Sequence, residues 1–313
     1  MNGSRLQLIA ISVMTSVAFV AVYVSMEHQA YVWDYGSYWI YYNKLGRMLS
    51  EDWMLGLTTL VVSIAKWDYN LSALIPLMPI YWIFGEGRTA YIGAVTVLYL
   101  VPTAWIASSL ASRDESPTDK DRALAFFAAM SFTPFWAPTL RGYIDIAGLI
   151  PIGCAALLLG RSKNLSEARL GIAVRFGLLL WCAFLLRRWY VFSALALAIV
   201  SASTVFMQRV FQGKNHLRVD NRIIMNYTWA GVAAATAALT IQTPLISRIL
   251  STSYSEAYIA YSAEPFVQLK LYYDQFGFFV LGLVLIGLIT DLSNGRRHSL
   301  FYACAAALCA ILF

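Results

Sequence analysis

Residues 6–26 read LQLIAISVMTSVAFVAVYVSM, an uncharged run that directly follows Arg5. A helix that crosses a bilayer needs roughly 20 mostly apolar residues, and this run is long enough. It is long for the apolar core of a secretory signal peptide, and no small-x-small cleavage site precedes Glu27. We therefore expect a signal anchor that is retained as the first membrane span.

Eight more apolar runs follow along the chain. They cover residues 90–110, 123–138, 146–160, 171–186, 189–207, 223–241, 276–290 and 300–313. Of the 313 residues, 59% are hydrophobic and 13% are charged, whereas soluble domains carry about 25% charged residues. The sequence therefore predicts an all-α polytopic membrane protein, a single domain over residues 1–313 with about nine transmembrane helices. It excludes a soluble globular domain, a disordered chain and a nucleic-acid-binding domain, despite a formal net charge of +6.

Two longer segments separate the runs. Residues 27–88 are rich in Tyr and Trp, and apolar side chains recur there at helical spacing from Tyr38 onward, which predicts an amphipathic helix in the membrane interface. The run 71–84 contains two prolines and is short for a crossing, so we expect it to be interfacial or re-entrant. Residues 242–275 form the second long outer loop. Because the last run ends at Phe313, inside an expected span, we expect the natural chain to continue.

The basic residues set the expected orientation. With a cytoplasmic N-terminus, the inner segments hold 13 of the 23 Lys and Arg residues in about half the length of the outer segments. The positive-inside rule therefore favours this orientation. It places residues 27–88, the 139–145 turn, the 187–188 corner and residues 242–275 together on the outer face of the cell (inner or plasma) membrane.

Ionisable and aromatic side chains gather in these outer segments. The candidates are the carboxylates Asp34, Asp68 and Asp145, the cations Arg141, Arg187 and Arg188, and the aromatic residues Trp33, Tyr35, Tyr38 and Tyr143. Charged groups at membrane depth cost about 2.5–3.5 kcal/mol each, so they pair or line a wet cavity. Arginines bind phosphate bidentately, and a carboxylate can act as a general base. This pattern predicts a site for an anionic lipid headgroup and a polar acceptor.

Each candidate also has a structural interpretation. Asp34 and Asp145 suit helix N-caps, and Arg187 and Arg188 suit cations that snorkel from a helix end. The aromatic residues suit an interfacial belt. The four cysteines and three histidines have no metal-ligand spacing, so no cofactor is predicted with certainty and a divalent metal remains open.

The order of these features resembles the GT-C glycosyltransferases, in particular the group of protein O-mannosyltransferases and lipid A aminoarabinose transferases. In that group the first outer loop reads approximately Asp-Glu-x-x-Tyr and continues in a helix that ends near Asp-Trp. Here Asp34-Tyr35-Gly36-Ser37-Tyr38 runs to Asp52-Trp53 with similar spacing. The resemblance covers roughly residues 1–210.

Further positions extend the resemblance. Asp68 falls where the group has an acid before a short apolar helix that ends in Phe-Gly, here Phe84-Gly85. Asp145 matches the aspartate of the second outer loop, and Arg187 or Arg188 stands where the group has a lysine that contacts the lipid phosphate. The paired Asp-Glu of the group is replaced by Asp34-Tyr35, which leaves metal binding by an acidic pair unsupported.

The resemblance implies an inverting glycosyltransferase that moves a sugar from a polyprenyl-phosphate donor to a glycan, lipid or protein acceptor. In this interpretation Asp34 is the general base, Asp68 and Asp145 orient the substrates, and Arg141, Arg187 and Arg188 bind the lipid phosphate. Trp33, Tyr35, Tyr38 and Tyr143 would contact the sugar or acceptor. The alternatives are a flippase or transporter of lipid-linked sugars and a non-catalytic subunit of a membrane complex.

Overall fold

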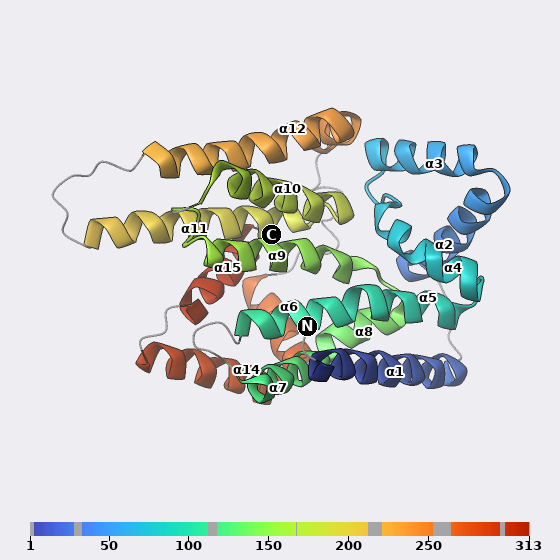
Figure 1. Ribbon diagram of the computed structural model, residues 1–313, viewed down its shortest axis with the longest axis horizontal. Helices are drawn as coiled ribbons and strands as arrows, with labels where there is room; N and C mark the ends of the chain where they lie inside the picture. The colour runs from blue at the N-terminus through green and yellow to red at the C-terminus, as the bar shows by residue number, and fades with distance from the viewer. Residues whose placement is uncertain are drawn as a thin grey trace.

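The computed structural model describes residues 3–27, 33–111, 118–166, 168–211, 221–252, 264–294 and 298–312. Within these ranges every regular element is a helix, and none is a strand (Figure 1). The elements are α1 (Gly3–Met26), α2 (Trp33–Glu51), α3 (Trp53–Lys66), η1 (Ser72–Leu77), α4 (Met78–Phe84), α5 (Arg88–Val95), η2 (Thr96–Leu100), α6 (Val101–Ala111), α7 (Asp119–Met130), α8 (Thr133–Arg141), η3 (Asp145–Gly148), α9 (Leu149–Arg161), α10 (Leu170–Leu186), α11 (Tyr190–Phe211), α12 (Asn221–Ser251), α14 (Pro265–Ser293) and α15 (His298–Leu312). The all-α expectation is confirmed for this part of the chain.

Five helical segments of the described ranges are long and apolar enough to cross a membrane. They are Gln7–Met26, Arg88–Ala111, Tyr190–Met207, Asn221–Ser251 and Phe276–Ser293. A sixth is formed if α7 and α8, which meet at a bend of 49°, count as one broken span. The structure therefore supports a multi-pass membrane protein, but the expected number of about nine spans is not confirmed.

The remaining expected spans are helical but short. Helix α10 has 17 residues and α9 has 13, so at 1.5 Å per residue they are about 25 Å and about 20 Å long, against about 30 Å of hydrocarbon. The run 123–138 is interrupted because α7 ends at Met130 and Pro134 lies in the first turn of α8. An apolar run thus overestimates the length of an unbroken helix wherever a proline or a polar turn divides it.

Helices α2, α3 and α4 gather at one end of the bundle, at the right of Figure 1, where α1 ends and α5 begins. The expected amphipathic helix is α2, which buries Tyr38, Tyr42 and Leu45 and exposes Lys44. The run 71–84 forms the short elements η1 and α4. Helix α12 extends to Ser251, inside the segment that was expected to be the second outer loop.

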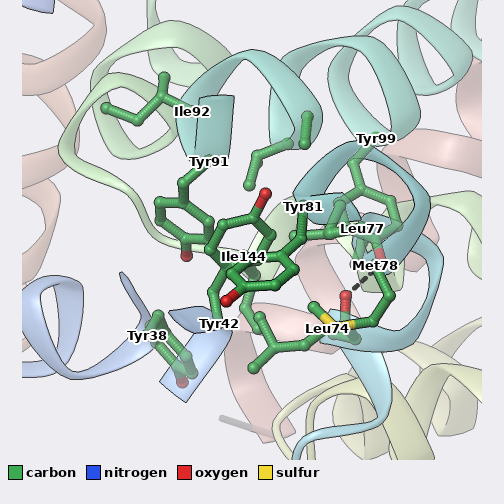
Figure 2. Close-up of a cluster of buried hydrophobic side chains, with 14 of the residues drawn as sticks. Tyr38, Tyr42, Leu74, Leu77, Met78, Tyr81, Tyr91, Ile92, Tyr99 and Ile144 are labelled. Atoms are coloured by element: carbon green, nitrogen blue, oxygen red, sulfur yellow. Dashed lines mark hydrogen bonds between the residues drawn. The ribbon is translucent and has the colours of Figure 1, made fainter. Parts of the chain in front are cut away.

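The core at this end of the molecule is aromatic. The Tyr42 ring lies 5.3 Å from the Tyr81 ring and 5.1 Å from the Tyr91 ring, measured between centroids (Figure 2). Tyr91 donates a hydrogen bond to the Gly142 carbonyl at 2.7 Å. Gly46 lets α2 approach α4, because a Cβ there would come within 2.5 Å of the Tyr81 ring. This packing fixes α2 against α4, α5 and the turn that precedes Asp145.

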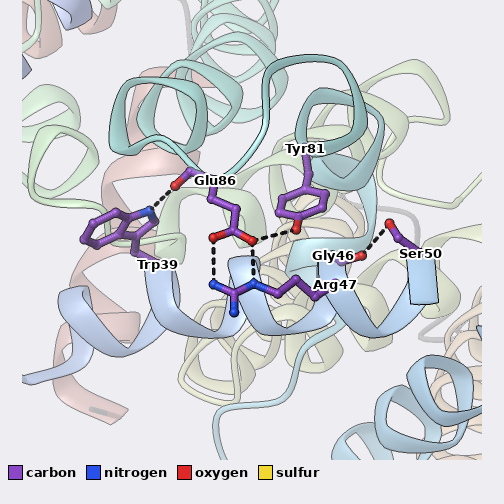
Figure 3. A network of polar contacts seen from close by, with 6 residues as sticks. All are labelled: Trp39, Gly46, Arg47, Ser50, Tyr81 and Glu86. Carbon is purple, nitrogen blue, oxygen red and sulfur yellow. Dashed lines mark hydrogen bonds and ion pairs between the residues drawn. The ribbon is translucent and has the colours of Figure 1, made fainter. Parts of the chain in front are cut away.

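Polar contacts with Glu86 also bind α2 to the turn between α4 and α5. The Arg47 guanidinium pairs with both oxygens of Glu86, Tyr81 donates to Glu86 at 3.1 Å, and the Trp39 indole donates to the Glu86 carbonyl at 3.0 Å (Figure 3). The bidentate geometry fixes the rotation of α2 about its axis. That rotation determines which residues of the first turn of α2, including Asp34, face the candidate site.

Candidate functional site

A cavity of about 350 Å³ lies between the start of α2, the loop after α3 and the end of α12. We call it the Asp34 cleft. Its lining residues are polar or aromatic and come from these three segments: Asp34, Ser37, Tyr38, Tyr41, Trp67, Asp68, Tyr69 and Arg248. Two carboxylates, one guanidinium and three tyrosines therefore share one small volume at a single end of the bundle.

Asp34 is the exposed acid of the Asp34 cleft. It lies in the first turn of α2. Among the described residues, no ion pair or hydrogen bond engages its side chain. Its carboxylate is thus available to accept a proton or a hydrogen bond from a ligand in the cleft.

Asp68 is held by two arginines. Its Oδ2 forms an ion pair with Arg188 Nη1 at 2.9 Å, and its Oδ1 accepts a hydrogen bond from Arg248 Nη2 at 2.7 Å. Arg188 is only 6% exposed, whereas Arg248 is 46% exposed. Asp68 neutralises the buried cation, and the second cation remains accessible from the cleft.

Asp145 and Arg187 form a second ion pair next to the cleft. Asp145 opens η3 directly after the turn at Gly142, whose left-handed φ of 91° suits glycine, and Tyr190 donates to the Asp145 carbonyl at 2.9 Å. Burial lowers the pKa of Arg187 and the Asp145 carboxylate raises it, with a net increase above the ordinary arginine value. Arg187 is therefore a permanent cation in a mostly buried position.

Aromatic rings connect the two ion pairs. The Arg187 guanidinium lies 4.4 Å from the centroid of Tyr69 and 5.0 Å from that of Tyr38. Arg188 lies 5.6 Å from the Tyr69 centroid and 4.5 Å from that of Trp189. These separations are typical of cation–π contacts, which are strongest where water is excluded. Tyr69 thus contacts both arginines and forms part of the wall of the Asp34 cleft.

Asn70 explains why the Asp68–Tyr69 loop lies over the arginines. Its amide nitrogen donates to the Leu185 carbonyl at 2.8 Å, near the end of α10, and its amide oxygen accepts from the Ser72 backbone nitrogen at 2.9 Å. The Leu71 backbone nitrogen donates to the Ser63 hydroxyl at 3.2 Å. A buried Asn with several backbone partners fixes a loop firmly, and here it ties the loop to the helix that precedes Arg187.

Most of the predicted charged residues meet at this end of the bundle. Asp34 and Asp68 line the cleft, and Asp145, Arg187 and Arg188 reach it through their contacts with Tyr38, Tyr69 and Asp68. Neither acid is a helix N-cap: Asp34 lies inside the first turn of α2, and Asp145 is the first residue of η3, whose N-cap is Ile144.

Arg141, expected beside the other phosphate-binding arginines, lies elsewhere. It is exposed at the end of α8 and lines a separate groove of about 670 Å³ against α1. Its carbonyl accepts a hydrogen bond from Arg88 at 3.2 Å. Tyr143 packs against the hydrophobic core and does not line the Asp34 cleft. The side chains of Trp33 and Tyr35 lie outside the described part of the structure.

Sequence reasoning missed five residues of the cleft, namely Ser37, Tyr41, Trp67, Tyr69 and Arg248. Trp67 and Tyr69 flank Asp68 and were visible as a Trp-Asp-Tyr triplet. Arg248 carried no local signal, because its place in the cleft depends on the course of α12. Within the described ranges, no group of three or more His, Cys, Asp or Glu side chains could hold a metal ion.

Comparisons with known proteins add no relative. No family model matches the chain, and neither the curated proteins nor the solved structures give a significant match.

Proposed function

We propose that this protein is an integral membrane glycosyltransferase that moves a sugar from a polyprenyl-phosphate donor to an acceptor. The observation that carries the proposal is that Asp34 and Arg248 line the same cleft. A carboxylate without a cationic partner can accept a proton, and an exposed guanidinium can bind a phosphate. Sugar transfer from a lipid phosphate requires both functions within one site.

In the proposed reaction, Asp34 takes the proton from the hydroxyl or amide of the acceptor. The acceptor atom attacks the anomeric carbon, and the bond between that carbon and the phosphate oxygen breaks with inversion. The leaving phosphate keeps the electron pair of the broken bond, and Arg248 stabilises the resulting anion. Cations aimed at developing negative charge lower the barrier of such a step directly.

The contacts modify the roles that the sequence suggested. Asp68 pairs with Arg188 and Arg248, and Asp145 pairs with Arg187, so the charges of both acids are already compensated. We assign them a positioning role, in which they hold Arg188 and Arg187 beside the cleft. The phosphate-binding role passes from Arg187 and Arg188, which are mostly buried, to Arg248, which faces the cleft.

The location of the cleft favours an enzyme over a transporter. A transporter carries its charged residues near the middle of the membrane, along the path of the substrate. Here the charged pairs join the loop after α3, the start of η3, the corner after α10 and the end of α12, all at one end of the bundle (Figure 1). With a cytoplasmic N-terminus, this end faces outward across the cell membrane.

The test uses the purified full-length protein in detergent, a panel of radiolabelled undecaprenyl-phosphate hexoses, and lipid, glycan and peptide acceptors. The wild type should transfer label, and Asp34→Asn should lose at least about a hundredfold in rate, as expected when a general base is removed. Asp119→Asn is the matched control, because Asp119 also lies exposed in a first helical turn, that of α7. Binding without turnover by the wild type, or near-normal turnover by Asp34→Asn, would overturn the proposal.

A further inference from the structure

Helix α2 buries two tyrosine hydroxyls that lie one turn apart. Tyr38 is 3% exposed and Tyr42 is 0% exposed. Among the described residues, neither hydroxyl has a hydrogen-bond partner. A buried tyrosine hydroxyl usually finds one, because an unsatisfied donor lowers the stability of the fold. Each of these two hydroxyls therefore calls for an explanation.

The surroundings of the two side chains differ. Tyr42 packs among aromatic rings, with Tyr81 and Tyr91 on either side, and it does not line the Asp34 cleft. Tyr38 lines that cleft together with Asp34. Figure 2 shows the Tyr38 ring to one side of the ring cluster around Tyr42. A ligand in the cleft can thus reach the side chain of Tyr38 and not that of Tyr42.

The ring of Tyr38 already has a partner. The Arg187 guanidinium lies 5.0 Å from its centroid, so one face of the ring is engaged in a cation–π contact. Stacking on a sugar, the role that the sequence suggested for this residue, would compete with that contact. Within the described ranges, the group of Tyr38 that lacks a partner is the hydroxyl.

The hydroxyl of Tyr38 is a donor at neutral pH. Burial raises the pKa of Tyr38 well above the usual tyrosine value, and the neighbouring Arg187 only partly opposes this increase. A protonated phenol can donate one hydrogen bond, and a fitting partner is an oxygen atom with a lone pair.

We propose that Tyr38 is a substrate-binding residue whose hydroxyl donates a hydrogen bond to an oxygen atom of a ligand in the Asp34 cleft. The ligand oxygen is the hydrogen-bond acceptor that the Tyr38 hydroxyl lacks among the described residues. This inference rests on the proposed function only for the identity of the ligand, an oxygen-rich lipid phosphate that carries a sugar. The bonding oxygen belongs either to the phosphate or to the sugar, and the two are separated by the test below.

The test compares Tyr38→Phe with Tyr42→Phe in the purified full-length protein. Both variants remove an unsatisfied hydroxyl, so the unliganded Tm of each should equal or exceed that of the wild type. Binding is measured with undecaprenyl phosphate and with undecaprenyl-phosphate glucose. Tyr38→Phe should weaken binding about tenfold, the usual effect of losing one hydrogen bond to a charged or polar ligand group. Tyr42→Phe should bind as the wild type does.

The two ligands identify the bonding oxygen. Equal losses of affinity for both assign the bond to the phosphate, and a loss with the glycosylated lipid alone assigns it to the sugar. The inference fails if Tyr38→Phe binds like the wild type, if Tyr42→Phe weakens binding to the same extent, or if Tyr38→Phe lowers the unliganded Tm. A wild type that binds both lipids without transferring sugar overturns the proposed function and leaves this inference standing. A wild type that binds neither overturns both.

Discussion

Asp68 and Arg248 are 180 residues apart in the sequence, and their side chains form an ion pair at 2.7 Å. The same carboxylate also binds Arg188 at 2.9 Å. One acid therefore joins the loop after α3, the corner between α10 and α11, and the end of α12. Two of these segments, the loop after α3 and the end of α12, line the Asp34 cleft.

The two arginines of Asp68 should contribute unequally to stability. Arg248→Gln breaks a pair that is half exposed, and such pairs contribute about 0–1 kcal/mol. Arg188→Gln removes a buried cation from a charge-assisted bond, which should cost on the order of 2 kcal/mol. Thermal or denaturant unfolding in detergent measures the difference, and equal losses for both variants would contradict it. By the proposed function, Arg248→Gln should still reduce turnover although the fold survives.

A buried ion pair ties the end of α1 to the start of α5. Arg88 and Glu27 lie 3.1 Å apart, and both side chains are 5% exposed. Glu27→Gln should destabilise the protein by about 3–5 kcal/mol, because it leaves the guanidinium buried without its counter-charge. Unfolding of the purified variant measures this loss.

The double variant tests the cause of that loss. Arg88→Met in the Glu27→Gln background removes the uncompensated charge, so it should recover part of the lost stability. If Glu27→Gln alone costs less than about 1 kcal/mol, the pair does not have this role.

The sequence was informative about which charges share one end of the molecule. Membrane spans alternate in direction, so their ends divide into two sets once the apolar runs are known. That alternation places Asp34, Asp68, Asp145 and Arg187 on one side of the membrane, and these residues do meet around the Asp34 cleft. It could not tell which of them pair.

The rest depended on local breaks in the helices. Arg248 reaches Asp68 along α12, which is kinked at Gln242 next to Pro244. A kink sets a direction that no hydrophobic pattern encodes. Arg141 shares the expected side of the membrane with Arg187, yet it faces the groove against α1. The order of spans along the chain predicts on which side of the membrane a residue lies. Whether that residue reaches a given site also depends on how its helix is rotated about its axis.

The contact between Arg47 and Glu86 predicts a dependence of stability on pH. The hydrogen bonds from Arg47, and then from Tyr81, lower the pKa of Glu86 from its ordinary value of 4.5. A lowered folded pKa adds stability that is complete above the unfolded pKa and is lost as the pH falls through the folded pKa. The Tm difference between the wild type and Glu86→Gln should therefore stay constant from neutral pH down to about 5.5 and shrink below about 4.5.

The control for this experiment is Glu51→Gln, at the exposed end of the same helix α2. Its Tm should follow the wild type throughout this pH range. A Tm difference between the wild type and Glu86→Gln that grows as the pH falls would contradict a lowered pKa of Glu86 in the folded protein.

Gly177 sets the distance between α10 and α12, and through it the geometry of the site. A Cβ at this position would lie 2.0 Å from the Ala230 carbonyl oxygen, a backbone atom that cannot move aside alone. Gly177→Ala should therefore push the two helices apart at a cost of about 1–3 kcal/mol. Because α10 leads to Arg188 and α12 carries Arg248, the same change should strain the Asp68 pairs and reduce binding in the cleft.

Gly171→Ala, on the same helix with open space around the new Cβ, should leave the Tm unchanged or slightly raised. If the two variants unfold alike, close packing of α10 against α12 does not hold the Asp34 cleft together.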